Sequence, residues 1–155
     1  MAQREIFTVT QIPNLQQSRR RGLAFLECSG RREFNARRVY ESLSESNRRT
    51  LRNRFDYWLQ GGRHDKYFHG WSDPDYRDCF VFKWKMRDQH QRIYGFLFNP
   101  RPRTDRVFQV CVLVSHAQKN TEQTDPSELN QVNELRIRSD VIEATKRAYP
   151  ENDLH

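Results

Sequence analysis

The sequence predicts an α+β fold, a small antiparallel sheet with two N-terminal helices packed on one face and a further helix at the C-terminus. Three strand-like runs follow one another at residues 79–86, 92–99 and 108–115. Two apolar stripes at helical spacing precede these runs, and a helix-capping pattern follows them. A length of 155 residues fits one domain, and an aromatic content of 12% provides large side chains for a small core.

The N-terminal part is expected to contribute least to the domain. Residues 1–21 mix a strand-like segment, residues 6–10, with the polar run Q-Q-S-R-R-R, and we interpret them as an extension or arm. The apolar run G-L-A-F-L-E-C at residues 22–28 is the first expected core strand. The domain should therefore span residues 22–149, with residues 150–155 as a tail.

Two helices are expected between the first strand and the strand-like runs, because apolar residues recur there at spacings of three and four. The first stripe comprises Ala36, Val39, Tyr40 and Leu43, and the second comprises Leu51, Phe55, Trp58 and Leu59. The opposite faces carry Arg37, Arg38, Arg48, Arg49, Arg52 and Arg54. We interpret these arginines as a solvated surface, with binding of RNA or of a protein inhibitor as the alternative. Residues 63–77, punctuated by Gly, Pro and Asp, are expected to form a loop.

Alternation along residues 79–86 predicts which side chains share a face of the sheet. Phe80, Phe82 and Trp84 alternate with two lysines, Lys83 and Lys85. The bulky aromatic set should pack against the helices, so both lysines should project side by side from the other face.

The last part of the chain should contain a central strand and a capped helix. Residues 108–115 are apolar enough for a central strand. Asp125 is the expected N-cap of the last helix, with Pro126 at its first position and Glu128 completing a capping-box-like pattern. Pro150 marks the latest end of that helix.

The charge balance favours a polyanionic partner. The formal net charge is +7 and the isoelectric point is about 9.7. Most of the cations are arginines, which can hold a phosphate with two parallel hydrogen bonds. Nucleic acid is the leading candidate and an acidic protein the second, and a basic protein without any polyanionic partner is the third interpretation.

The cysteines and the chain start bear on the cellular compartment. The chain has three cysteines, Cys28, Cys79 and Cys111. An odd number of cysteines without paired spacing favours a reducing cytoplasm over a disulfide framework. Met1 is followed by polar and charged residues, so no signal peptide is expected. No apolar run approaches the length of a bilayer span, so no membrane partner is expected.

Three motifs resemble those of one bacterial protein family. Residues 78–86 read D-C-F-V-F-K-W-K-M, which resembles the strand pattern D-C-Y-K-I-K-L-K. Residues 91–94 read Q-R-I-Y, which resembles Y-R-[LV]-[VL]-Y. K-N-T-E-Q-T-D at residues 119–125 is similar to K-K-T-Q-K-T-P. These patterns belong to the RelE/HigB-type toxins of toxin–antitoxin pairs, the last one to the phage-derived HigB-like branch. That superfamily also has the order strand, two helices, three antiparallel strands, helix.

The resemblance implies a function and a set of site residues. Members of the family are endoribonucleases that cut mRNA, on the ribosome or free of it, and a cognate antitoxin inhibits them. Carried over by position, the implied catalytic residues are Lys83, Lys85, Arg92 and Lys119. Val81 and Asn120 replace lysines of the family patterns, and the C-terminal catalytic tyrosine of the family has no match in this chain.

The chemistry of RNA cleavage suits these residue types. When the RNA 2′-hydroxyl attacks the adjacent phosphate, one proton must be accepted, another donated, and negative charge on a phosphorane stabilised. A cluster of Lys83, Lys85 and Arg92 would stabilise that charge and depress the lysine pKa values, so that a lysine could carry a proton near neutral pH. His116 is a further catalytic candidate, since a histidine carries protons without any pKa shift. The reaction requires no metal and no other cofactor.

Other candidates have two interpretations. Arg101 and Arg103 belong to the rigid turn N-P-R-P-R and either hold RNA or only decorate the turn. Tyr94 either contacts RNA or belongs to the core. His64 and His69 are close in sequence but lack further ligands at a recognised spacing, so a zinc site is not expected.

The catalytic candidates also have ordinary structural explanations. Lys83 and Lys85 can be solvent-facing strand residues, Arg92 can form a plain salt bridge, and His116 can bond to backbone at a strand end.

Three functions therefore compete. The cationic cluster favours an mRNA endonuclease, and the missing tyrosine favours a non-cleaving toxin that binds a protein such as DNA gyrase, as ParE-like members do. The third function is a basic RNA-binding domain without toxicity.

Overall fold

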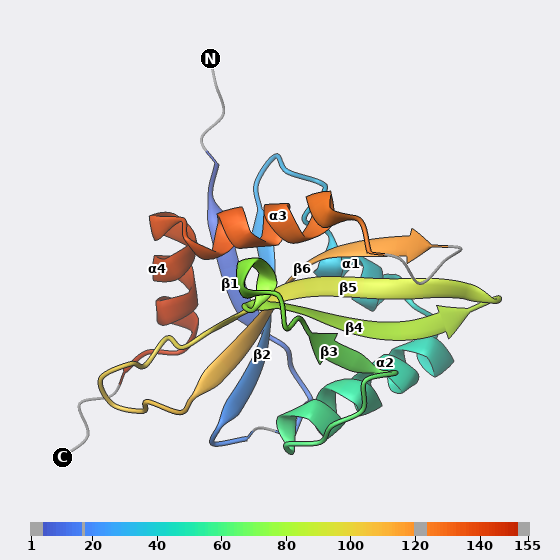
Figure 1. Cartoon of the computed structure of the whole chain (residues 1–155), viewed down its shortest axis with the longest axis horizontal. Helices are drawn as coiled ribbons and strands as arrows, with labels where there is room; N and C mark the ends of the chain where they lie inside the picture. The colour runs from blue at the N-terminus through green and yellow to red at the C-terminus, as the bar shows by residue number, and fades with distance from the viewer. Residues whose placement is uncertain (1–4, 17, 120–123, 152–155) are drawn as a thin grey trace.

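The computed structural model describes residues 5–16, 18–119 and 124–151, which form a six-stranded sheet with helices on both faces (Figure 1). In chain order the elements are β1 (Phe7–Gln11), β2 (Arg21–Cys28), α1 (Ala36–Ser42), α2 (Glu45–Leu59), β3 (Phe68–Gly70), the 3-10 turn η1 (Pro74–Tyr76), β4 (Cys79–Met86), β5 (Gln89–Phe98), β6 (Gln109–Lys119), α3 (Pro126–Arg136) and α4 (Ser139–Ala148). The α+β class expected from the sequence is confirmed. None of the described helices is long and apolar enough to cross a lipid bilayer.

The sheet is mixed, whereas the sequence analysis expected an antiparallel one. The strand order is β1-β2-β6-β5-β4-β3, and β2 pairs with β6 in parallel while the other pairs are antiparallel. A parallel pair needs a long connection between its strands, and the chain from α1 to β5 provides one. β6 lies between β2 and β5, which confirms the expected central strand.

Two segments that were expected to lie outside the sheet form its edges. β1 pairs with β2, and Phe7, Val9 and Ile12 are buried, so much of the expected N-terminal arm belongs to the domain. β3 lies inside the expected loop at residues 63–77 and pairs with β4. These strands have five and three residues, which is too short for alternation to distinguish them from their surroundings.

The sheet separates two hydrophobic cores. On one face, α1 and α2 cover the aromatic side chains Phe80, Phe82 and Trp84 of β4, as expected. On the other face, α3 and α4 cover a core that includes Tyr94 of β5 and Val112 of β6. α3 packs across β5 and α4 packs against β1 (Figure 1). The two helices at residues 36–59 thus lie on one face of the sheet, with the C-terminal helices on the other.

The expected last helix is divided in two. α3 begins at the expected N-cap, where the Asp125 carboxylate accepts a hydrogen bond from the Ser127 backbone N–H at 2.9 Å. The helix ends at Arg136, and Arg138 adopts an extended conformation before α4. Because of this break, the apolar residues of both helices face the sheet, although the apolar residues of α3 and those of α4 do not follow one continuous helical period. Residues 152–155 of the expected tail and residues 1–4 of the expected arm lie outside the described residues.

Several of the helix arginines make contacts within the protein, contrary to the interpretation of the whole set as solvated surface, and Arg48 and Arg54 are the most informative. Arg48 donates to the Glu41 carbonyl oxygen at 2.9 Å, close to the end of α1. The Arg54 guanidinium lies 4.1 Å from the centroid of the Tyr67 ring and donates to the Lys83 carbonyl oxygen. α2 therefore anchors the backbone of β4 at Lys83, from the face opposite to the lysine side chain.

Candidate functional site

Four cationic residues share one face of the sheet near the turn between β4 and β5. Lys83 pairs with Arg92, and Lys85 pairs with His90, which in turn pairs with Lys119. Directly paired residues project from the same face, as do residues two apart in a strand. We call Lys83, Lys85, Arg92 and Lys119 the basic face. The two lysines lie side by side as expected, and the structure brings Arg92 and Lys119 to them.

Arg92 is the most enclosed member of the basic face. Only 4% of the residue is exposed, and its Nη1 donates to the Thr124 hydroxyl at 3.0 Å and to the Tyr94 hydroxyl at 3.4 Å. Burial raises the pKa of Tyr94 to about 12, so this hydroxyl stays protonated at neutral pH. Tyr94 is fully buried, and it can act on a ligand only by orienting the Arg92 guanidinium.

Lys119 connects the basic face to the start of α3. Its Nζ lies 3.1 Å from Glu128 Oε2, and the two side chains are 15% and 25% exposed. Lys83 is half-buried and Lys85 is exposed, so these two lysines are the members of the basic face most accessible to a ligand. Most of the motif that begins at Lys119 falls on residues 120–123, including Asn120, which lie outside the described residues.

His116 lies on the opposite face of the sheet. Its ring centroid is 6.0 Å from that of Trp84, in the core covered by α1 and α2. Its Nε2 lies 2.6 Å from Gln91 Oε1, and because an amide oxygen can only accept, Nε2 carries the proton. Burial lowers the pKa of the ring, which favours its neutral form. The structure therefore does not bring His116 together with the basic face.

Arg101 and Arg103 form a separate surface in the loop after β5. Arg101 follows Arg92 by nine positions, roughly 30 Å along an extended chain. Its guanidinium lies 4.5 Å from the centroid of the Phe108 ring. Arg103 is exposed, and its backbone N–H donates to Glu151 Oε1 at 3.4 Å. Any RNA contact that these arginines make is remote from the basic face.

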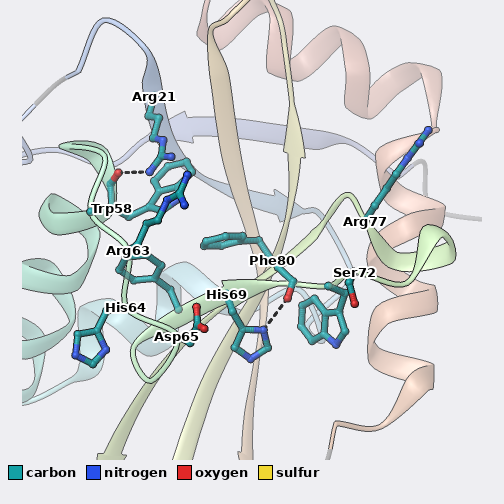
Figure 2. Close-up of a pocket in the computed structure, with 13 residues that line it drawn as sticks. Arg21, Trp58, Arg63, His64, Asp65, His69, Ser72, Arg77 and Phe80 are labelled. Atoms are coloured by element: carbon teal, nitrogen blue, oxygen red, sulfur yellow. Dashed lines mark hydrogen bonds between the residues drawn. The ribbon is translucent and has the colours of Figure 1, made fainter.

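His69, which the sequence analysis did not assign to an RNA site, borders the basic face. It pairs with Val81, so its side chain shares the face of Lys83. Its pKa is lowered mainly by burial, and also by the charges of Lys83 and Arg92, so the ring is neutral at pH 7. Its Nδ1 lies 2.8 Å from the Gly70 carbonyl oxygen (Figure 2), so Nδ1 carries the proton and Nε2 is left as a proton acceptor.

Trp71 extends this border. Its ring centroid lies 4.9 Å from that of His69 and 6.4 Å from that of Tyr94, and the side chain is half-buried. The only sequence signal for either residue is the density of His, Lys and aromatic residues in the 63–77 segment. A three-residue strand is too short to predict from sequence which face His69 occupies.

The cysteines are not part of the basic face. Cys79 and Cys111 are buried core residues, and burial raises the pKa of Cys79 to about 11 and that of Cys111 further. Both therefore remain thiols at neutral pH. Among the described residues, no group of three or more His, Cys, Asp or Glu side chains is arranged to hold a metal ion.

The chain matches no protein-family model, and searches of curated proteins and of solved structures also give no match. Membership of the RelE/HigB-type family therefore stays a hypothesis that rests on the three sequence motifs.

Proposed function

We propose that this protein is a toxin-type endoribonuclease, related to the RelE/HigB-type toxins, and that its basic face binds the RNA segment that is cut. The supporting observation is that Lys83, Lys85 and Arg92 converge from two strands onto one face beside the neutral ring of His69. Fixed cations suit the charge of a phosphorane, and a neutral imidazole suits proton transfer near pH 7. The order of the elements β2, α1, α2, β4, β5, β6 and α3 also agrees with the layout of that family.

In the proposed reaction, the 2′-hydroxyl attacks the adjacent phosphorus and the 5′-oxygen of the next nucleotide leaves. His69 Nε2 accepts the proton of the 2′-hydroxyl. Lys83 and Arg92 stabilise the charge on the non-bridging oxygens, with Arg92 held in place by its bonds to Tyr94 and Thr124. Lys85 is the most exposed of these cations and donates the proton to the leaving oxygen.

The proposed partners are mRNA, bound to the ribosome or free, and a cognate antitoxin that covers the basic face. The net charge of +7 supports both, since each partner must present negative charge to this surface.

RNA binding without cleavage is the second candidate function, and one observation favours it. Cations of the basic face are engaged within the protein, among them Arg92 by Tyr94 and Thr124 and Lys119 by Glu128. Cations held by other protein groups can still attract RNA, but RNA binding does not require them to stabilise the charge of a transition state.

Cleavage of labelled single-stranded RNA by the purified protein, in the presence of EDTA, tests the proposal. We expect products that end in a 2′,3′-cyclic phosphate, and a single 2′-deoxy nucleotide at the cut position should prevent cleavage there. Arg92→Lys keeps the charge but loses the two-pronged hydrogen bonding of the guanidinium, so cleavage should slow by about ten-fold or more while RNA affinity falls far less. Arg147→Lys, an exposed site on α4, which packs at β1, is the control.

The outcomes separate the two candidates. Intact RNA with normal binding would support the second function, and equal loss of binding and cleavage in Arg92→Lys would make Arg92 a general anchor. Absence of RNA binding by the wild-type protein would contradict both functions.

A further inference from the structure

A pocket of about 580 Å³ lies beside the basic face, between the end of α2 and residues 71–77 (Figure 2). Its charged lining residues are Arg21, Arg63, Arg77 and Asp65, so three arginines face one carboxylate. His69 of β3 and Trp71, which follows that strand, also line the pocket. The volume lies within the range of small-molecule sites, which is large enough for one nucleotide.

Arg21 and Arg63 give this pocket an uncompensated positive charge. Burial and the charge of Arg63 both lower the pKa of Arg21, which places the two cations within range of each other. Within the described part of the chain, neither arginine forms an ion pair, although carboxylates engage many other arginines. Two neighbouring cations without a counter-ion favour an anionic ligand.

Arg21 also removes a charge that would oppose such a ligand. The carbonyl end of a helix carries partial negative charge, and α2 points this end toward the pocket. Arg21 Nη1 donates to the Trp58 carbonyl oxygen at 2.6 Å, and its guanidinium lies 4.7 Å from the centroid of the Trp58 ring. Arg21 is thereby held in one orientation, and Arg63, which is exposed, is the more mobile contact for a ligand.

The pocket and the basic face meet at His69 and Trp71. His69 lines the pocket and also lies near the charges of Lys83 and Arg92. Lys83 and Val81, the partner of His69, are two residues apart on β4, about 7 Å along the strand. A single RNA strand that crosses Lys83 therefore reaches the pocket within a short distance.

We propose that this pocket binds one nucleotide of the same single-stranded RNA, next to the segment on the basic face. The base stacks on the half-buried ring of Trp71, and a phosphate contacts Arg21 and Arg63. Aromatic side chains beside a cationic track are a general means of binding single strands. This inference rests on the proposed function for the RNA, but it requires binding alone and no cleavage.

Binding of a fluorescent twelve-nucleotide RNA with a 2′-O-methyl group at every position, which has no free 2′-hydroxyl to attack a phosphate, tests this inference. Trp71→Leu removes the stacking surface and keeps an apolar contact with Tyr94, so affinity should fall roughly five-fold or more. Arg63→Ala should weaken binding and make the slope of log affinity against log salt shallower by about 0.7. Arg147→Ala removes an equal charge from the exposed side of α4, which packs at β1, and should leave the affinity within about two-fold of wild type.

Tryptophan fluorescence supplies a second measurement. Trp84 is 3% exposed and does not line the pocket, and Trp58 lines it but is also only 3% exposed, so most of the quenching by bound RNA should come from Trp71 and be lost in Trp71→Leu. Unchanged affinity in both Trp71→Leu and Arg63→Ala would overturn the inference, as would quenching that is undiminished without Trp71. Competition by inorganic phosphate as strong as that by a mononucleotide would also overturn it, because the base would then contribute nothing. These readouts are independent of cleavage, whose absence would count only against the proposed function.

Discussion

The double substitution Lys83→Ala/Lys85→Ala tests whether the basic face binds RNA. Each phosphate contact on a single strand contributes about 0.7 to the slope of log affinity against log salt. Lys83 and Lys85 are the members of the basic face most accessible to a ligand, and the substitution removes both of their contacts. The slope should therefore become shallower by about 1.4. Between roughly 50 and 200 mM salt, the affinity of the wild-type protein should fall about seven-fold more than that of the variant.

Fluorescence anisotropy of a labelled single-stranded RNA at four salt concentrations measures these slopes. Lys146→Ala/Arg147→Ala is the matched control, because both residues are exposed on α4, which packs at β1. β1 lies four strand spacings from β4, about 19 Å. Arg54 bonds to the Lys83 carbonyl, which the substitution keeps, so the free energy of unfolding should change by no more than about 1 kcal/mol. An unchanged slope, or an equal change in the control, would refute the assignment of the basic face as the RNA-binding surface.

Two further predictions concern the scaffold and its pH dependence. Gly95→Ala should lower the melting temperature by roughly 3–10 °C, because the added Cβ would meet the Val112 carbonyl group. Gly70→Ala is the control: the atom nearest to its added Cβ lies at 3.5 Å, so the melting temperature should change little. Thermal scans of both variants decide this, and equal melting temperatures would contradict it. Burial lowers the pKa of His116 in the folded state, so the folded protein favours the neutral ring. The contribution of His116 to stability is therefore complete above the unfolded pKa of about 6.5, and it is lost as pH falls through the folded pKa. Urea unfolding should therefore show a larger loss of stability between about pH 7 and pH 5 for the wild-type protein than for His116→Gln, and parallel curves would show that His116 does not titrate.

Local rules in the sequence determined most of the helices and central strands. Apolar spacing located α1 and α2, and the Asp125 cap located the start of α3. Alternation along β4 placed Lys83 and Lys85 on one face and the aromatic residues on the other, because a strand repeats every two residues whatever it pairs with. The segment that forms β1 was recognised as strand-like at residues 6–10, but its place in the sheet was not, and β3 escaped prediction altogether, because pairing with a longer neighbour decides both.

Only the tertiary structure decided which residues of β6 join the basic face. The pairing of β5 with β6 shifts by one residue at Tyr94 and Gly95, where β6 advances from Leu113 to Ser115. In an uninterrupted strand, His116 would share the face of Val112 and Lys119 would lie on the other. The bulge reverses this phase beyond Val114, so that Lys119 joins Arg92 while His116 turns toward Trp84.

The sequence by itself determined the α+β class, helices α1 and α2, the start of α3, the positive charge and the shared face of Lys83 and Lys85, since each depends on composition or on a local period. The mixed sheet, the enclosure of Arg92 by Tyr94 and Thr124, and the place of His69 beside Lys83 depend on contacts between residues far apart in the chain. Such contacts follow from strand pairing and register, which a single extra residue in β6 is enough to change.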